Sequence, residues 1–119
     1  MSAIQAAMEF KDLMDLSEKG NLVSSYTFSD TERVVFVTDV WYAMDVKFKK
    51  HFLANLSMLQ DAISGHYFFE VRHDHSNEKV GQVTAFGGSL EVYKQTRQGR
   101  GVPSLYPHSP IHEYLISDL

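Results

Sequence analysis

The spacing of apolar residues near the start of the chain predicts an amphipathic helix over residues 2–19. Apolar side chains recur there at three- and four-residue steps, and acidic side chains lie on the opposite side. Ser2 is placed to cap this helix, with Gln5 three residues on, and Gly20 is suited to end it. The apolar stripe consists of Ile4, Ala7, Met8, Lys11 and Met14, with Phe10, Leu13 and Leu16 beside it.

A longer helical pattern occupies residues 39–64 and predicts one continuous helix. Thr38 or Asp39 supplies its N-cap, and Gly65 ends it. At the usual rise per residue the helix is about 38 Å long, which is enough to cross a whole sheet. Its recurring positions are Trp41, Met44, Phe48, Phe52, Asn55, Leu56, Leu59 and Ile63.

Five segments have the composition and alternation of β-strands, and they span residues 22–28, 33–38, 66–73, 80–86 and 89–95. Turn residues join the first two into a hairpin. The second is apolar on both faces, which is typical of an interior strand. We expect Gly87 and Gly88 to form the two-residue turn of a later hairpin, because glycine reaches positive φ without strain.

These elements predict an α+β fold in the order α-ββ-α-βββ. We expect an antiparallel sheet covered on one face by the long amphipathic helix. Residues 1–95 are predicted to form a single α+β domain. Residues 96–119 contain all three prolines of the chain and predict an extended C-terminal tail that docks on the domain or on a partner chain. Its last part, residues 111–119, fits either a short helix or a docking segment.

Composition and charge narrow the classes of function. The chain has no cysteine, which excludes disulfides, thiolate metal sites and cysteine nucleophiles. Its net charge of −4 argues against nucleic acid as the main partner. The first ten residues lack the pattern of a signal peptide, and no apolar run approaches the ~20 residues of a membrane span. We therefore expect a cytoplasmic protein that does not associate with membranes.

The six histidines are the first candidates for chemistry. His73 and His75 lie two residues apart on a predicted strand and could grip one metal ion from the same side, with Asp74 joining if the strand bends. Zinc sites use at least three protein ligands in nearly all cases. A third ligand would have to come from His51, His66, His108 or His112, which the sequence cannot place. We predict no metal and no cofactor, and His73 and His75 are the candidates if a metal is bound.

No catalytic residue is predicted. Serines are plentiful, but none stands in the G-x-S-x-G context of a nucleophile elbow. The sequence also has no phosphate-binding loop and no dinucleotide fingerprint. The question of catalysis stays open, and the sequence favours a protein that is not an enzyme.

A surface for a protein partner is predicted on the third strand. Phe68, Glu70 and Arg72 alternate along it and form a mixed apolar and charged patch if that face of the sheet is exposed. If the face is covered, Glu70 and Arg72 should pair with charges on neighbouring strands. The predicted partner-binding residues are completed by Tyr93 on the fifth strand and by Tyr106 and Tyr114 in the tail.

The sequence therefore favours a non-catalytic protein-interaction module, such as a small regulatory, adaptor or inhibitor protein. Its partner is another protein or a second copy of itself in a homodimer, since tails and edge strands commonly pair across two-fold axes. The alternative is a small-molecule- or metal-binding domain with an aromatic pocket between helix and sheet. The side chains available for that pocket are Tyr26, Phe28, Phe36, Trp41, Tyr67 and Phe69.

Overall fold

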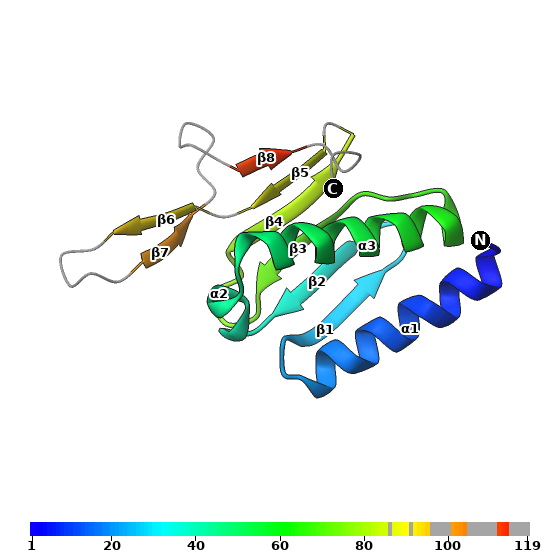
Figure 1. The fold of residues 1–119 in the computed structure, drawn as a ribbon, viewed down its shortest axis with the longest axis horizontal. Helices are drawn as coiled ribbons and strands as arrows, with labels where there is room; N and C mark the ends of the chain where they lie inside the picture. The colour runs from blue at the N-terminus through cyan, green and yellow to red at the C-terminus, as the bar shows by residue number, and fades with distance from the viewer. Residues whose placement is uncertain (86, 91, 96–100, 105–111, 115–119) are drawn as a thin grey trace.

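The computed structural model describes residues 1–85, 87–90, 92–95, 101–104 and 112–114 of the chain. The α+β class predicted from the sequence is confirmed (Figure 1). The elements follow one another as α1 (Ala3–Lys19), β1 (Val23–Phe28), β2 (Arg33–Val37), α2 (Val40–Ala43), α3 (Val46–Ser64), β3 (Phe69–His73), β4 (Lys79–Thr84), β5 (Gly87–Leu90), β6 (Val92–Gln95), β7 (Gly101–Ser104) and β8 (His112–Tyr114).

The larger sheet is mixed, so the prediction of a purely antiparallel sheet was wrong. The described strands form a six-stranded sheet in the order β1-β2-β3-β4-β5-β8 and a separate pair, β6-β7. Within the larger sheet β2 and β3 run parallel, with Val35 opposite Val71, and the other neighbours are antiparallel. The reason is the connection between them. The helices α2 and α3 return the chain to the end at which β2 began, so β3 starts there and runs the same way.

Two helices, not one, cover the inner face of the sheet. Figure 1 shows α1 and α3 on the same side of the strands, and the two helices contact each other. α1 also contacts β1, whereas α3 contacts β4 and β5. Among the described residues, no helix has the length and apolar character needed to cross a bilayer. The core between the layers includes the fully buried side chains Val35, Trp41, Leu53, Leu56 and Val71.

The first helix begins as predicted, and it buries Met14 and Phe10 but not the rest of its predicted apolar stripe. The Ser2 side chain accepts a hydrogen bond from the Gln5 N–H at 3.1 Å, which is the expected N-cap. However, Ile4 and Met8 of the predicted apolar stripe are 76% and 64% exposed. The residues that α1 buries are Ala6, Phe10, Met14 and Ser17.

Aromatic packing explains this orientation of α1. Phe10 meets the rings of Tyr26 and Phe28 on β1 edge-on, with centroid distances of 5.7 and 5.2 Å. Such edge-to-face contacts of large rings outweigh the burial of Ile4 and Met8, which lie on the other side of the helix.

The predicted long helix is broken near its start. α2 ends at Ala43, Met44 is extended, and the Asp45 carboxylate caps α3 by accepting a hydrogen bond from the Phe48 N–H at 2.7 Å. An aspartate that bonds the free N–H groups of the next turn starts a new helix instead of continuing the old one. α3 is therefore only about 28 Å long. Gly65 ends it in the left-handed conformation, with φ of 78°.

The hairpin between β4 and β5 turns earlier than predicted. Val83 lies opposite Gly88 and Thr84 opposite Gly87, so both glycines belong to β5 and the turn precedes them. Gly87 has φ of 115°. Glycine is therefore required where β5 begins, and not within the turn itself.

The predicted fifth strand, residues 89–95, is divided between the two sheets. β5 ends at Leu90 in the larger sheet, and β6 pairs with β7. In the proline-containing segment, His112–Tyr114 form β8, which pairs with β5, so the alternative of a short helix does not hold for these residues.

Candidate functional site

The outer face of β3 and β4 carries a small group of charges. Residues of β3 alternate in burial, with Phe69, Val71 and His73 turned inward and Glu70 and Arg72 outward. Glu70 lies 2.9 Å from Arg72 on its own strand and 3.4 Å from Lys79 on β4. Cross-strand pairing of Glu70 is therefore present, yet Glu70 and Arg72 each keep about a third of the side chain exposed to solvent.

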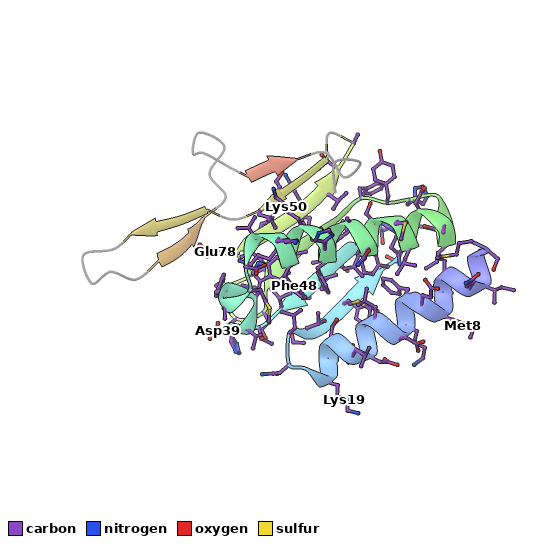
Figure 2. All side chains as sticks on the ribbon, in the orientation of Figure 1. Met8, Lys19, Asp39, Phe48, Lys50 and Glu78 are labelled. Atoms are coloured by element: carbon purple, nitrogen blue, oxygen red, sulfur yellow. The ribbon has the colours of Figure 1, made fainter. Side chains whose placement is uncertain are left out.

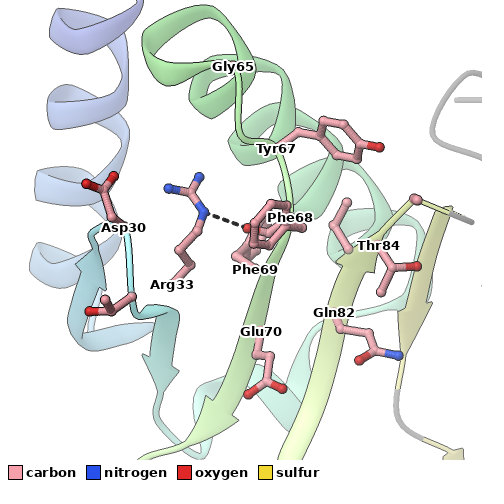
Figure 3. A pocket seen from close by; sticks show the side chains of 12 residues that line it. Asp30, Arg33, Gly65, Tyr67, Phe68, Phe69, Glu70, Gln82 and Thr84 are labelled. Atoms are coloured by element: carbon pink, nitrogen blue, oxygen red, sulfur yellow. Dashed lines mark hydrogen bonds between the residues drawn. The ribbon is translucent and has the colours of Figure 1, made fainter.

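A hollow of about 540 Å³ opens at one end of this face (Figure 3). Its floor is the start of β3, and its walls are the β1–β2 turn and the end of β4. Phe68 and Tyr67 stand at it with 49% and 37% of their surfaces exposed, which is unusual for aromatic side chains so close to a core. The hollow is lined by Asp30, Thr31, Arg33, Gly65, Tyr67, Phe68, Phe69, Glu70, Gln82, Val83, Thr84 and Ala85.

Arg33 fixes the shape of this hollow. Its guanidinium donates to the Phe68 carbonyl at 2.8 Å, to the His66 carbonyl, and to the Gln60 side chain at 3.0 Å. The guanidinium carbon Cζ also lies 5.4 Å from the centre of the Phe68 ring. Burial lowers the pKa of Arg33, and the nearby Asp30 carboxylate acts in the opposite direction. Arg33 therefore bonds the backbone of Phe68 and lies against its ring, and about half of the Phe68 surface is exposed to solvent.

The other predicted partner-binding residues lie elsewhere. Tyr93 belongs to β6, opposite Pro103 of β7, and so it does not extend the β3 patch within the larger sheet. Tyr114 belongs to β8 and lies opposite Gly88 of β5. Tyr106 lies outside the described residues.

The aromatic residues expected to line a pocket between helix and sheet lie in different parts of the structure. Phe28 and Phe69 pack against each other at 5.7 Å, and Trp41, fully buried, packs against Phe52 at 5.9 Å. Tyr67 lines the outer hollow instead.

A second cluster surrounds His73 at the opposite end of β3. The ring nitrogen Nε2 lies 2.7 Å from the Asp39 carboxylate, and Nδ1 lies 2.8 Å from the Ser76 hydroxyl. Because Nδ1 also accepts a hydrogen bond from the Ser76 N–H at 3.2 Å, the ring proton of neutral His73 sits on Nε2 and is donated to Asp39. The sequence places Ser76 three residues after His73, the spacing of a local turn.

The serine, histidine and aspartate of this cluster have the order of a hydrolytic triad, but not its surroundings. A triad needs backbone N–H groups aimed at a developing oxyanion. Here the Ser76 N–H bonds His73, the Glu78 N–H bonds the Ser76 hydroxyl, and the Asn77 N–H bonds the His73 carbonyl. The Asp39 side chain is 82% exposed. We interpret the cluster as the closure of the β3–β4 hairpin.

The two histidines proposed as metal candidates do come near each other, with ring centres 5.9 Å apart. Asp74 lies between them, and its Oδ1 is 3.7 Å from His73 Nε2, 3.8 Å from His75 Nε2 and without a hydrogen-bond partner. However, both ring nitrogens of His73 are already engaged. Within the described ranges, no three His, Asp or Glu side chains are arranged to hold a metal ion.

No pattern in the sequence pointed directly to Arg33 as the residue that joins the start of β2 to the loop after α3. Its only signal was a single charge at the start of an otherwise apolar strand, Arg-Val-Val-Phe-Val. The acceptors that Arg33 bonds lie 27 to 35 residues away along the chain, so only the parallel crossover brings them together.

Comparison of the chain with protein families, with curated proteins and with solved structures finds no match.

Proposed function

We propose that the chain is a non-catalytic protein-interaction module that binds another protein at the hollow on the outer face of its sheet. The observation that carries this proposal is Phe68, a half-exposed ring that lies against Arg33 at a hollow of about 540 Å³. Aromatic side chains that are fixed before binding lose little conformational entropy on contact, and they are enriched among the residues that dominate binding energy.

The surroundings of Phe68 suit a mixed protein surface. Tyr67 adds a second exposed aromatic ring and Glu70 lines the same hollow, while Arg72 and Lys79, which pair with Glu70, lie further along the same face. Contact surfaces between proteins commonly have such an apolar centre and a polar rim. The cytoplasmic location expected from the sequence is part of the proposal, and the module acts there as a regulator, adaptor or inhibitor.

The test compares proteins captured from the native host by the full chain and by two variants. Phe68→Ser removes the ring from the hollow, and Met58→Ser removes a side chain that is similarly exposed, at 56%, on α3. We expect a partner that the wild type and Met58→Ser retain and that Phe68→Ser binds about tenfold more weakly, as loss of one contact of ~1.4 kcal/mol predicts.

Urea denaturation of each variant provides the control for folding. If both variants lose the partner equally, or if Phe68→Ser retains it, the hollow is not the binding site. If the chain is instead a small-molecule-binding domain, a compound that binds the hollow should raise the melting temperature of the wild type but not that of Phe68→Ser.

A further inference from the structure

The first strand of the sheet offers an open edge. β1 is the terminal strand in the order of the described sheet and pairs on one side with β2. The hydrogen bond from the Ser29 N–H to the Glu32 carbonyl, together with the register, places the backbone groups of Ser25 and Thr27 toward β2. Those of Tyr26 and Phe28 consequently point outward, away from the sheet.

This edge lacks most of the features that keep sheet edges apart. Edge strands of monomers usually carry charged residues or proline. β1 reads Val-Ser-Ser-Tyr-Thr-Phe and contains neither. Its one irregularity lies between Val23 and Ser25, so the segment from Ser25 to Phe28 keeps a regular register.

An exposed apolar strip on α1 flanks the same edge. α1 lies alongside β1, because Phe10 packs on Tyr26 and Phe28. At 100° per residue, Ile4 and Met8 fall on one line of the helix surface with Lys11 and Asp15. Figure 2 shows Met8 on the side of α1 that faces away from α3, and Figure 1 shows α1 as the outermost helix beside β1.

The charges on this surface favour a second copy of the chain over an oppositely charged partner. A two-fold contact brings each surface against itself, so an unbalanced charge would meet its own sign. β1 has no charge. On the α1 strip, Lys11 and Asp15 form an i,i+4 pair at 2.8 Å and neutralise each other, which leaves the exposed Glu18 at the end of the helix as its one unbalanced charge. A chain with net charge −4 can approach its own copy most easily where the surface carries so little net charge.

We propose that β1 pairs antiparallel with β1 of a second copy across a two-fold axis. The two sheets join into one, and Ile4 and Met8 of each copy close over the joint. This interface involves neither Phe68 nor the hollow, so it stands or falls independently of the proposed function.

The first experiment measures hydrogen exchange of single amides in the full chain. In the dimer, the outward N–H groups of Tyr26 and Phe28 exchange as slowly as those of Ser25 and Thr27, which bond β2. Dilution to the monomer should speed exchange at Tyr26 and Phe28 alone. Fast exchange at both residues at every concentration would overturn the proposal. The same result is expected if this edge binds a strand of a different protein and not a second copy of the chain.

The second experiment measures mass by sedimentation, with matched variants. The wild type should reach twice the chain mass of 13.6 kDa. Thr27→Lys places a charge on the edge and should give a monomer, whereas Asn55→Lys adds the same charge on α3 and should stay dimeric. A dimer that survives Thr27→Lys, or that both substitutions disrupt, contradicts the proposal.

A second pair of variants covers the case in which Thr27→Lys fails to fold. Met8→Ser and Leu16→Ser remove side chains of similar exposure, 64% and 67%, from different sides of α1. Met8→Ser should weaken dimerisation about tenfold, as burial of one apolar side chain predicts. Leu16→Ser should leave dimerisation unchanged. If Met8→Ser and Leu16→Ser weaken dimerisation equally, the α1 strip is not part of the interface.

Discussion

Side-chain hydrogen bonds hold both ends of the parallel strand pair β2 and β3, but different residue types make them. At the end where both strands start, the Arg33 guanidinium bonds two backbone carbonyls and the Gln60 side chain. At the end where both strands finish, the His73 imidazole joins Asp39, at the start of α2, to Ser76 in the β3–β4 turn. Each fastening holds one end of the α2–α3 crossover against the sheet.

The difference lies in what each side chain bonds. Arg33 is permanently charged and binds carbonyls of the return loop from 27 to 35 residues away, so no local rearrangement can replace it. His73 bonds Ser76, only three residues away, and its other partner Asp39 is largely exposed. The Arg33 end therefore joins segments that are far apart in the chain, whereas the His73 end closes a turn.

The largest effect is expected from Arg33→Met. The change leaves the Phe68 and His66 carbonyls and the Gln60 side chain without their donor, and hydrogen bonds to a charged group contribute most among such contacts. We expect the free energy of unfolding, measured by urea denaturation, to fall by about 3 kcal/mol.

Arg33→Lys provides the control for charge. Lysine keeps the positive charge but cannot reach three separate acceptors with a compact ammonium group. It should recover less than half of the loss. Full recovery would mean that charge alone, and not the geometry of the guanidinium, holds the crossover.

A smaller effect is expected from His73→Gln. The imidazole is buried and makes hydrogen bonds at both nitrogens, so its loss should lower the free energy of unfolding by about 1–2 kcal/mol. Asp39→Asn should cost less than about 0.5 kcal/mol, because water replaces an exposed partner. If Asp39→Asn costs as much as His73→Gln, the Asp39 bond dominates and the contrast between the two ends disappears.

Local patterns in the sequence were sufficient for much of the fold. The Ser2 cap, the β1–β2 hairpin and the alternation of β3 all depend on neighbouring residues, and the structure shows each of them. The parallel pairing of β2 with β3 depends on how the α2–α3 connection returns over the sheet, which no local pattern records. The break at Asp45 was visible only as one aspartate inside a strong helical period.

The same reasoning explains what could be predicted of the candidate site. Strand alternation placed Glu70 and Arg72 on the outer face, and Phe68 lines the same hollow as Glu70. The hollow itself depends on Arg33 and on the β1–β2 turn meeting the loop after α3. Those segments lie far apart in the chain, and only the tertiary arrangement joins them.

The smallest effect is expected from the Lys11–Asp15 pair on α1, in which both side chains are exposed. Its contribution to stability is the reference against which the contributions of Arg33 and His73 are compared. The hydrogen bond and charge of Asp15 raise the pKa of Lys11 above its ordinary value of 10.5. A group whose pKa is raised by folding stabilises the folded state below its unfolded pKa, and this stabilisation is lost as pH rises through the folded pKa. Asp15→Asn should therefore be slightly less stable than wild type at about pH 8, and the difference should shrink as the pH rises through the raised pKa of Lys11. High salt should also remove the difference, and Glu9→Gln, which takes a charge from α1 without breaking this pair, should not reproduce its pH dependence. A difference that stays the same as the pH rises would mean that Asp15 acts through helix structure and not through the charge of Lys11.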